Sequence, residues 1–102
     1  MALSEERSWI IAYDIADPKR LGRIHRYLKS VALPAQYSVF IAVTSANEIR
    51  RIRDRLSALI DPGEDDVRIY LVPKRGTVTV LGRGVLPDGL SLPAIPLDIR
   101  SG

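Results

Sequence analysis

The amino-acid sequence predicts an α+β domain in which two amphipathic helices cover one face of a β-sheet. Segments rich in β-branched and aromatic residues alternate with two segments whose apolar residues recur every three or four positions. Proline, glycine and helix-capping residues separate these segments. The chain has 102 residues, which is the usual size of one domain.

The first strand is predicted over residues 8–15, a nearly continuous apolar run that is typical of a central strand. This run contains Trp9, Ile10, Ile11, Tyr13 and Ile15. Asp14 interrupts the run near its end. A carboxylate there is costly to bury unless a metal, a cation or hydrogen bonds compensate, so Asp14 needs an explanation.

The first helix is predicted to begin at Asp17-Pro18, because aspartate caps free amides and proline suits the first helical position. One side of this helix is apolar and is formed by Leu21, Ile24, Leu28 and Val31. The opposite side is cationic and carries Lys19, Arg20, Arg23, Arg26 and Lys29. Gly22 costs about 1 kcal/mol of helix propensity relative to alanine, so we expect close packing or a close chain approach at that position.

Leu33-Pro34 ends the helix, and the β-rich residues 35–44 follow. Ten extended residues are long for one strand, so we expect either one long strand or a hairpin with its turn near Gln36 to Ser38. Ser45 and Glu48 then form a capping box for a second helix, which Asp61-Pro62-Gly63 ends. The outside of the second helix carries Arg50, Arg51, Arg53 and Arg55.

After an acidic loop at residues 64–66, two more strands are predicted over residues 67–72 and 77–81. The resulting order β-α-β-(β)-α-β-β is the ferredoxin-like arrangement, which we assign to residues 1–81. Residues 82–102 combine frequent proline and glycine with many apolar residues. We expect them to form an extended arm docked on the dimer or on a partner. Because the helices gather on one face, the other face is available for a second copy of the chain.

Composition excludes several kinds of site. The absence of cysteine rules out a disulfide scaffold and any thiolate metal site, and one histidine cannot form a zinc site with several imidazoles. No segment reaches the roughly 20 apolar residues of a membrane span, and no signal peptide is visible. We therefore expect a cytoplasmic protein that does not bind membranes. The net charge of +3 favours a polyanionic partner.

Two interpretations of Asp14 remain open from the residues alone. It either caps or hydrogen-bonds the loop after its strand, or it binds a hard cation such as Mg²⁺, which is often held by one or two carboxylates and water. Two copies of Asp14 across a dimer axis would make a more complete site. A magnesium ion there could polarise a phosphodiester and activate water. Asp17 is interpreted as the helix cap, and His25 as a surface residue.

The cationic helix faces suit contacts to a phosphate backbone, which are strong and not sequence-specific. The predicted nucleic-acid-binding residues are Lys19, Arg20, Arg23, Arg26, Lys29, Arg50 and Arg51. Few aromatic residues are available for stacking on bases, which favours duplex over base recognition.

Three segments carry a resemblance to a known family. They are Tyr13-Asp14-Ile15, then Asp17-Pro18-Lys19-Arg20, then Gln36-Tyr37-Ser38-Val39-Phe40. In order and spacing they resemble the CRISPR-associated Cas2 family over residues 8–81. The resemblance implies a ferredoxin-like homodimer in which the C-terminal strand of one subunit pairs with the sheet of the other. It also implies Asp14 as the Mg²⁺ ligand and catalytic residue, surrounded by Tyr13, Arg20, Arg23, Ser38 and Phe40.

The function that the resemblance implies is a CRISPR adaptation subunit, active in spacer acquisition, that binds duplex DNA and bridges integrase subunits. A magnesium-dependent endonuclease activity on RNA or DNA is also described for the family. Many members carry a basic residue shortly before the Gln-x-Ser-Val-Phe stretch, whereas residues 33–35 are uncharged here. This departure weakens the nuclease interpretation more than the scaffold interpretation. The alternatives are a stand-alone, toxin-like ribonuclease of the same fold and a non-catalytic nucleic-acid-binding module.

Overall fold

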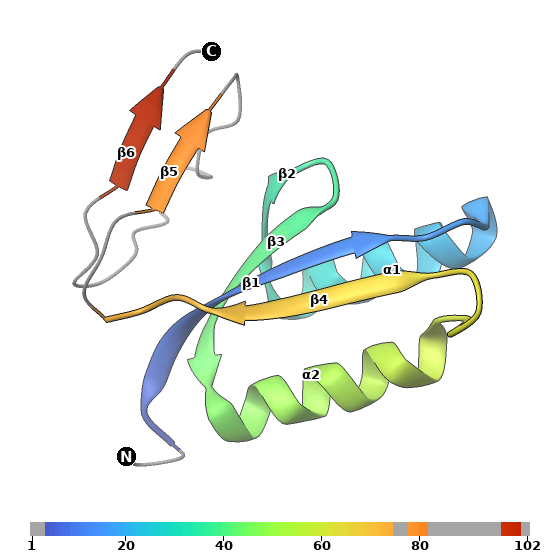
Figure 1. Ribbon diagram of the computed structural model, residues 1–102. Helices are drawn as coiled ribbons and strands as arrows, with labels where there is room; N and C mark the ends of the chain where they lie inside the picture. The colour runs from blue at the N-terminus through green and yellow to red at the C-terminus, as the bar shows by residue number, and fades with distance from the viewer. Residues whose placement is uncertain (1–3, 75–77, 82–96, 101–102) are drawn as a thin grey trace.

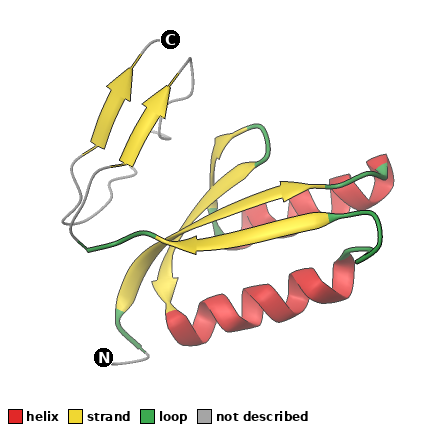
Figure 2. Ribbon diagram, in the orientation of Figure 1, coloured by secondary structure: helices red, strands yellow, loops and turns green. Residues whose placement is uncertain are grey.

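Two helices lie on one side of a four-stranded antiparallel sheet (Figure 2). The computed structural model describes residues 4–74, 78–81 and 97–100. The elements, labelled in Figure 1, are β1 (Glu6–Asp14), α1 (Pro18–Val31), β2 (Leu33–Gln36), β3 (Val39–Ser45), α2 (Ala46–Leu59), β4 (Asp66–Leu71), β5 (Val78–Leu81) and β6 (Leu97–Arg100). The strand order β2-β3-β1-β4 places β1 in the interior of the sheet, and the ferredoxin-like fold predicted from the sequence is confirmed.

The hydrophobic core lies between the helices and the sheet. Successive residues of a strand point to opposite faces, and the buried Ile11 and Tyr13 belong to the face of β1 that packs under the helices. The core also contains Ile24 and Leu28 of α1, Phe40 and Ala42 of β3, and Ile49, Ile52 and Leu56 of α2. This arrangement explains the three- and four-residue spacing of apolar residues in both helices.

Helix α1 begins as the sequence predicts, because the Asp17 carboxylate accepts a hydrogen bond from the Arg20 amide (2.8 Å) and Pro18 is the first helical residue. The expectation of a close chain approach at Gly22 is wrong. A Cβ atom built at Gly22 would meet no heavy atom within 4 Å, and the residue is exposed. Gly22 therefore weakens the helix without improving its packing.

The segment after α1 is a hairpin and not one long strand. Strands β2 and β3 pair antiparallel, with an irregularity in register between Pro34 and Gln36, and only Tyr37 and Ser38 separate them. The turn lies at the Asp14 end of β1, because the β1–β3 register ends at Ala12↔Val39 and the Tyr13 amide then donates to the Ser38 carbonyl (3.0 Å).

Helix α2 begins with half of the predicted capping box. The Ser45 hydroxyl accepts a hydrogen bond from the Glu48 amide (3.1 Å). The Glu48 carboxylate turns outward and accepts a hydrogen bond from Arg51 (2.8 Å). The first turn of α2 is thus held by the serine, while the glutamate neutralises one of the arginines outside it.

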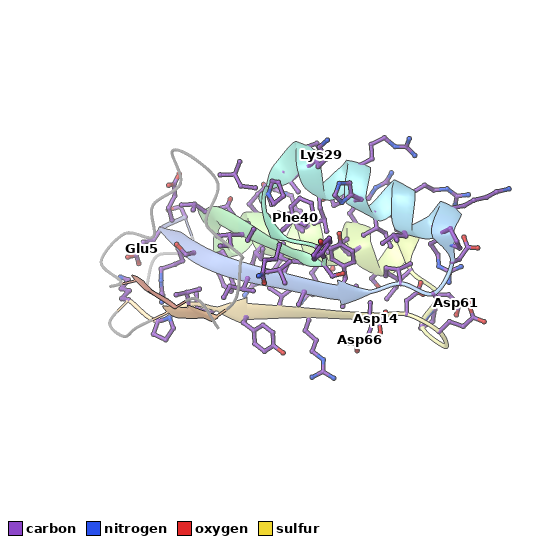
Figure 3. The ribbon with its side chains drawn as sticks, turned by 90° about the horizontal axis from the view of Figure 1, so that it is seen from above. Glu5, Asp14, Lys29, Phe40, Asp61 and Asp66 are labelled. Atoms are coloured by element: carbon purple, nitrogen blue, oxygen red, sulfur yellow. The ribbon has the colours of Figure 1, made fainter. Side chains whose placement is uncertain are left out.

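The face of the sheet opposite the helices is apolar and partly open. It carries Ile10 and Ala12 of β1 beside Ile41 and Val39 of β3. Leu33, Val43 and Tyr70 on this face are 43%, 37% and 50% exposed. No helix of the described residues covers this face, in agreement with the expectation that it is available to a second copy of the chain (Figure 3).

The chain leaves the sheet at the end opposite Asp14. The Val72 amide donates to the Ser8 carbonyl (2.9 Å), Arg7 donates to the Val72 carbonyl (3.3 Å), and Lys74 forms an ion pair with Glu5. Beyond this junction, β5 and β6 form a separate parallel pair with Val78 opposite Leu97. Most of the predicted arm, residues 82–96, lies outside the described residues, and the pairing of a C-terminal strand with a partner subunit stays a prediction.

Candidate functional site

Asp14 is the last residue of β1, and its side chain is exposed. Because side chains alternate along a strand, Asp14 points to the face opposite the helices, whereas its neighbour Tyr13 points into the core. Within the described residues the Asp14 carboxylate forms no hydrogen bond and no ion pair. The interpretation of Asp14 as a loop cap therefore has no contact to support it, and its oxygens are free to bind an external group.

A second carboxylate lies directly across the strand from Asp14. Asp66 is the first residue of β4 and is the register partner of Asp14 in the β1–β4 ladder, and Figure 3 shows the two side by side at one end of the sheet. The sequence predicts an acidic loop at Asp66, whereas the structure shows Asp66 in a strand and paired with Asp14. If the predicted strand over residues 67–72 began one residue earlier, its alternation would place Asp66 on the same face as Arg68. In the structure Arg68 donates a hydrogen bond to the Asp66 carboxylate (3.0 Å).

Two adjacent carboxylates provide oxygen ligands of the kind that Mg²⁺ prefers, so the donor set fits that ion. The described residues contain no group of three or more acidic, histidine or cysteine side chains that could hold a metal. Further ligands for a cation at Asp14 and Asp66 would have to come from water, from a phosphate or from a second copy of the chain.

Of the residues that the resemblance placed around Asp14, Tyr13 and Phe40 lie on the other face of the sheet, under the helices. Phe40 is buried and stacks against Tyr13, with ring centroids 6.1 Å apart. The Tyr13 hydroxyl donates to the Tyr37 carbonyl (3.3 Å) and lies 3.3 Å from Nδ1 of His25, whose ring meets Phe40 edge-on at 5.4 Å. Burial raises the pKa of Tyr13. Tyr13 and Phe40 therefore support the Asp14 end of the sheet from beneath, and Ser38 contributes its backbone carbonyl.

Arg20 is bound to a buried carboxylate. The side chain of Asp65 is fully buried and accepts hydrogen bonds from Nε (2.5 Å) and Nη2 (3.0 Å) of Arg20 and from the amides of Ala16 (3.0 Å) and Asp61 (2.8 Å). The Arg20 guanidinium lowers the pKa of Asp65 well below its usual range, and Asp65 in turn raises that of Arg20. The Ala16–Asp65 hydrogen bond joins the loop after Asp14 to the loop before Asp66, and the Arg20–Asp65 ion pair joins the first turn of α1 to the same loop. Because Asp65 neutralises its charge, Arg20 is less available to a phosphate than the other cations of α1.

The remaining cations of α1 are free. Lys19, Arg23, Arg26 and Lys29 are exposed, and their side chains form no ion pair or hydrogen bond within the described part of the chain. On α2, Arg51 pairs with Glu48 and Arg53 pairs with Asp54 (3.0 Å), while Arg50 is exposed without an acidic partner there. Helix α1 thus presents the stronger continuous positive charge.

Neither described helix has the length and hydropathy of a membrane span, since each has 14 residues. Comparisons with known proteins agree with the fold. A family model described as CRISPR associated protein Cas2 matches residues 7–79. The CRISPR-associated endoribonuclease Cas2 1 of Nitrosomonas europaea is 43% identical over 88 residues, which cover 86% of this chain and 84% of that protein.

A second relative, the CRISPR-associated endonuclease Cas2 2 of Thermus thermophilus, is 39% identical over 83 residues, or 81% of this chain and 90% of its own. Among solved structures, a hypothetical protein from Thermus thermophilus matches with a TM-score of 0.74 at 38% identity. That match covers 82% of this chain and 100% of the other. The names of the two relatives differ in whether they specify RNA.

Proposed function

Because this chain belongs to the CRISPR-associated Cas2 family, we propose that it is an adaptation subunit that binds duplex DNA as a homodimer and bridges integrase subunits during spacer acquisition. The observation that carries the proposal is the row of four free cations on α1, formed by Lys19, Arg23, Arg26 and Lys29. Free cations can neutralise phosphates and release counterions, which drives binding to nucleic acid of any sequence.

The open face of the sheet supports the homodimer. Large apolar side chains such as Leu33, Val43 and Tyr70 remain substantially exposed on it, and covering such a face by an identical face would remove them from water. Strand β4 is an edge of the sheet, so it also has backbone groups available for a strand of the partner. A symmetric dimer would present two copies of the α1 cations to one duplex.

A magnesium-dependent endonuclease activity is the second candidate function, and the adjacent carboxylates of Asp14 and Asp66 favour it. A bound Mg²⁺ would supply charge stabilisation at a phosphodiester. The chain itself would contribute the two carboxylates that hold the ion, with Arg68 orienting that of Asp66. The hydrogen bonds that Asp65 accepts from Ala16 and Arg20 would fix the loops next to these two strand ends.

The experiment for DNA binding compares two charge reversals of equal size. Arg23→Glu with Arg26→Glu removes two free cations from α1, and Arg53→Glu with Arg55→Glu makes the same change in net charge on α2. Titration of a labelled 30-base-pair duplex against salt should show the α1 variant losing most of its affinity and the α2 variant losing little. Equal losses would show that net charge alone attracts the duplex, and unchanged affinity in the α1 variant would refute the proposed surface.

The experiment for cleavage uses the Asp14→Ala variant and a chelator, with single-stranded RNA and duplex DNA as substrates. Activity should be lost in both conditions while light scattering shows an unchanged dimer. Cleavage that survives Asp14→Ala would remove Asp14 from the catalytic site and leave the scaffold function standing alone.

A further inference from the structure

Tyr37 is the most exposed large hydrophobic residue in the described part of the chain. It is 99% exposed, whereas the other exposed large hydrophobic residues there are at most 50% exposed. The ring therefore gains nothing from folding. Single exposed aromatic residues occur on many surfaces, so exposure alone does not identify a contact.

The backbone that carries Tyr37 accepts two hydrogen bonds from Tyr13. The Tyr37 carbonyl accepts a hydrogen bond from the Tyr13 hydroxyl (3.3 Å), and the next carbonyl, that of Ser38, accepts one from the Tyr13 amide (3.0 Å). Tyr13 is buried and stacked on Phe40. The turn that carries the exposed ring is thus hydrogen-bonded to a residue of the hydrophobic core. A ligand that binds the ring therefore avoids the entropic cost of ordering a flexible loop.

The position of the ring joins it to the charged groups already described. The β2–β3 turn follows the last register pair of β1 and β3 at the Asp14 end of the sheet. His25 of α1 lies 3.3 Å from the same Tyr13 hydroxyl, so the middle of α1 lies beside this turn. The aromatic ring therefore lies at the end of the sheet where β1 ends in Asp14, next to the helix that carries the free cations.

We propose that Tyr37 is a stacking platform for an unpaired base and makes the protein favour nucleic acid with a single-stranded end over a blunt duplex. The inference rests on the proposed binding of nucleic acid and adds the form of the substrate. Bases inside a duplex are already stacked on both faces, so an exposed ring can gain only from an unpaired base. Such stacking is sequence-tolerant because every base has an aromatic face, which matches backbone contacts through the cations.

The test measures the affinity of the full chain for a 20-base-pair blunt duplex and for the same duplex with five unpaired thymidines at each 3′ end. Wild type and Tyr37→Phe should prefer the overhang. Tyr37→Leu, which keeps an apolar side chain without the ring, and Tyr37→Ala should lose about 5- to 150-fold in overhang affinity. Their affinity for the blunt duplex should stay unchanged.

Three results would overturn the inference. The first is a wild type that binds both duplexes equally, which leaves the proposed DNA binding intact. The second is an overhang preference that survives in Tyr37→Leu and Tyr37→Ala. The third is a change of dimer mass by light scattering in those variants, which would place the ring at a contact between copies. Failure of the wild type to bind either duplex would instead refute the proposed function itself.

Discussion

Replacing Asp14 by asparagine should stabilise the folded protein when no divalent cation is present. Asp14 and Asp66 are register partners on one face of the sheet, and like charges directly across a strand pair are destabilising. With Cβ atoms about 5 Å apart and nearly water-like screening, Coulomb repulsion between the two carboxylates is about 0.8 kcal/mol. Arg68 donates to Asp66 (3.0 Å) and offsets part of it.

The expected gain in the free energy of unfolding is therefore about 0.3–0.8 kcal/mol for either Asp14→Asn or Asp66→Asn. For a domain of this size that corresponds to a rise in Tm of about 1–6 °C. The double variant should gain no more than the better single variant, because both substitutions remove the same repulsion.

Thermal unfolding at a fixed protein concentration, with and without Mg²⁺, measures these changes. Magnesium at ten times its dissociation constant should stabilise the wild type by about 1.4 kcal/mol and the asparagine variants by less. Asp17→Asn is the matched control, since it removes the same charge three residues later at a helix cap and should not raise Tm. A lower Tm for Asp14→Asn would refute the argument and restore the alternative in which Asp14 holds its loop.

Three more predictions concern other parts of the chain. Gly22→Ala should raise the free energy of unfolding by about 0.5–1 kcal/mol, because Gly22 lies in a helix with open space around it; denaturant titration measures this, and a loss of stability would reveal a contact at that position. Asp65 should make stability fall as the pH drops below about 4, because its folded pKa is lowered by Arg20 and the unfolded chain takes up the proton first. In Asp65→Asn that acid limb of the stability profile should flatten, and an identical profile would contradict the assigned ion pair. Truncation after Leu81 should weaken the dimer or its contact with an integrase if the arm is docked, and unchanged mass together with unchanged partner binding would show that the arm is dispensable.

The order of the elements could be predicted from the sequence because local rules determine it. Asp17-Pro18 and Ser45 are helix starts by their own chemistry, and the structure shows both caps in place. The choice between one long strand and a hairpin at residues 35–44 could not be made, because it depends on the Tyr13–Ser38 contact, which lies 25 positions apart in the chain. Gly22 was misjudged because a low helix propensity says nothing about what surrounds the residue.

The candidate site was predictable only in part, for the same reason. Asp14 stands out within its own strand, whereas Asp66 becomes its neighbour through pairing of β1 with β4. The cationic face of α1 follows from helical periodicity, but the removal of Arg20 from that face depends on Asp65, 45 residues away. Whether a charge is free or neutralised is thus decided by tertiary contacts that periodicity does not contain.

A tag or label can be attached to this protein without approaching Asp14. The place for it is the junction where Glu5 contacts Lys74 and Ser8 contacts Val72. The first described residues and the exit toward β5 meet there, at the far end of β1 from Asp14 (Figure 1). The nine residues of β1 span roughly 30 Å. An affinity tag, surface tether or fluorophore attached next to Glu5 would lie about that far from the carboxylate pair. Immobilisation through that end should therefore leave the proposed nucleic-acid surface accessible.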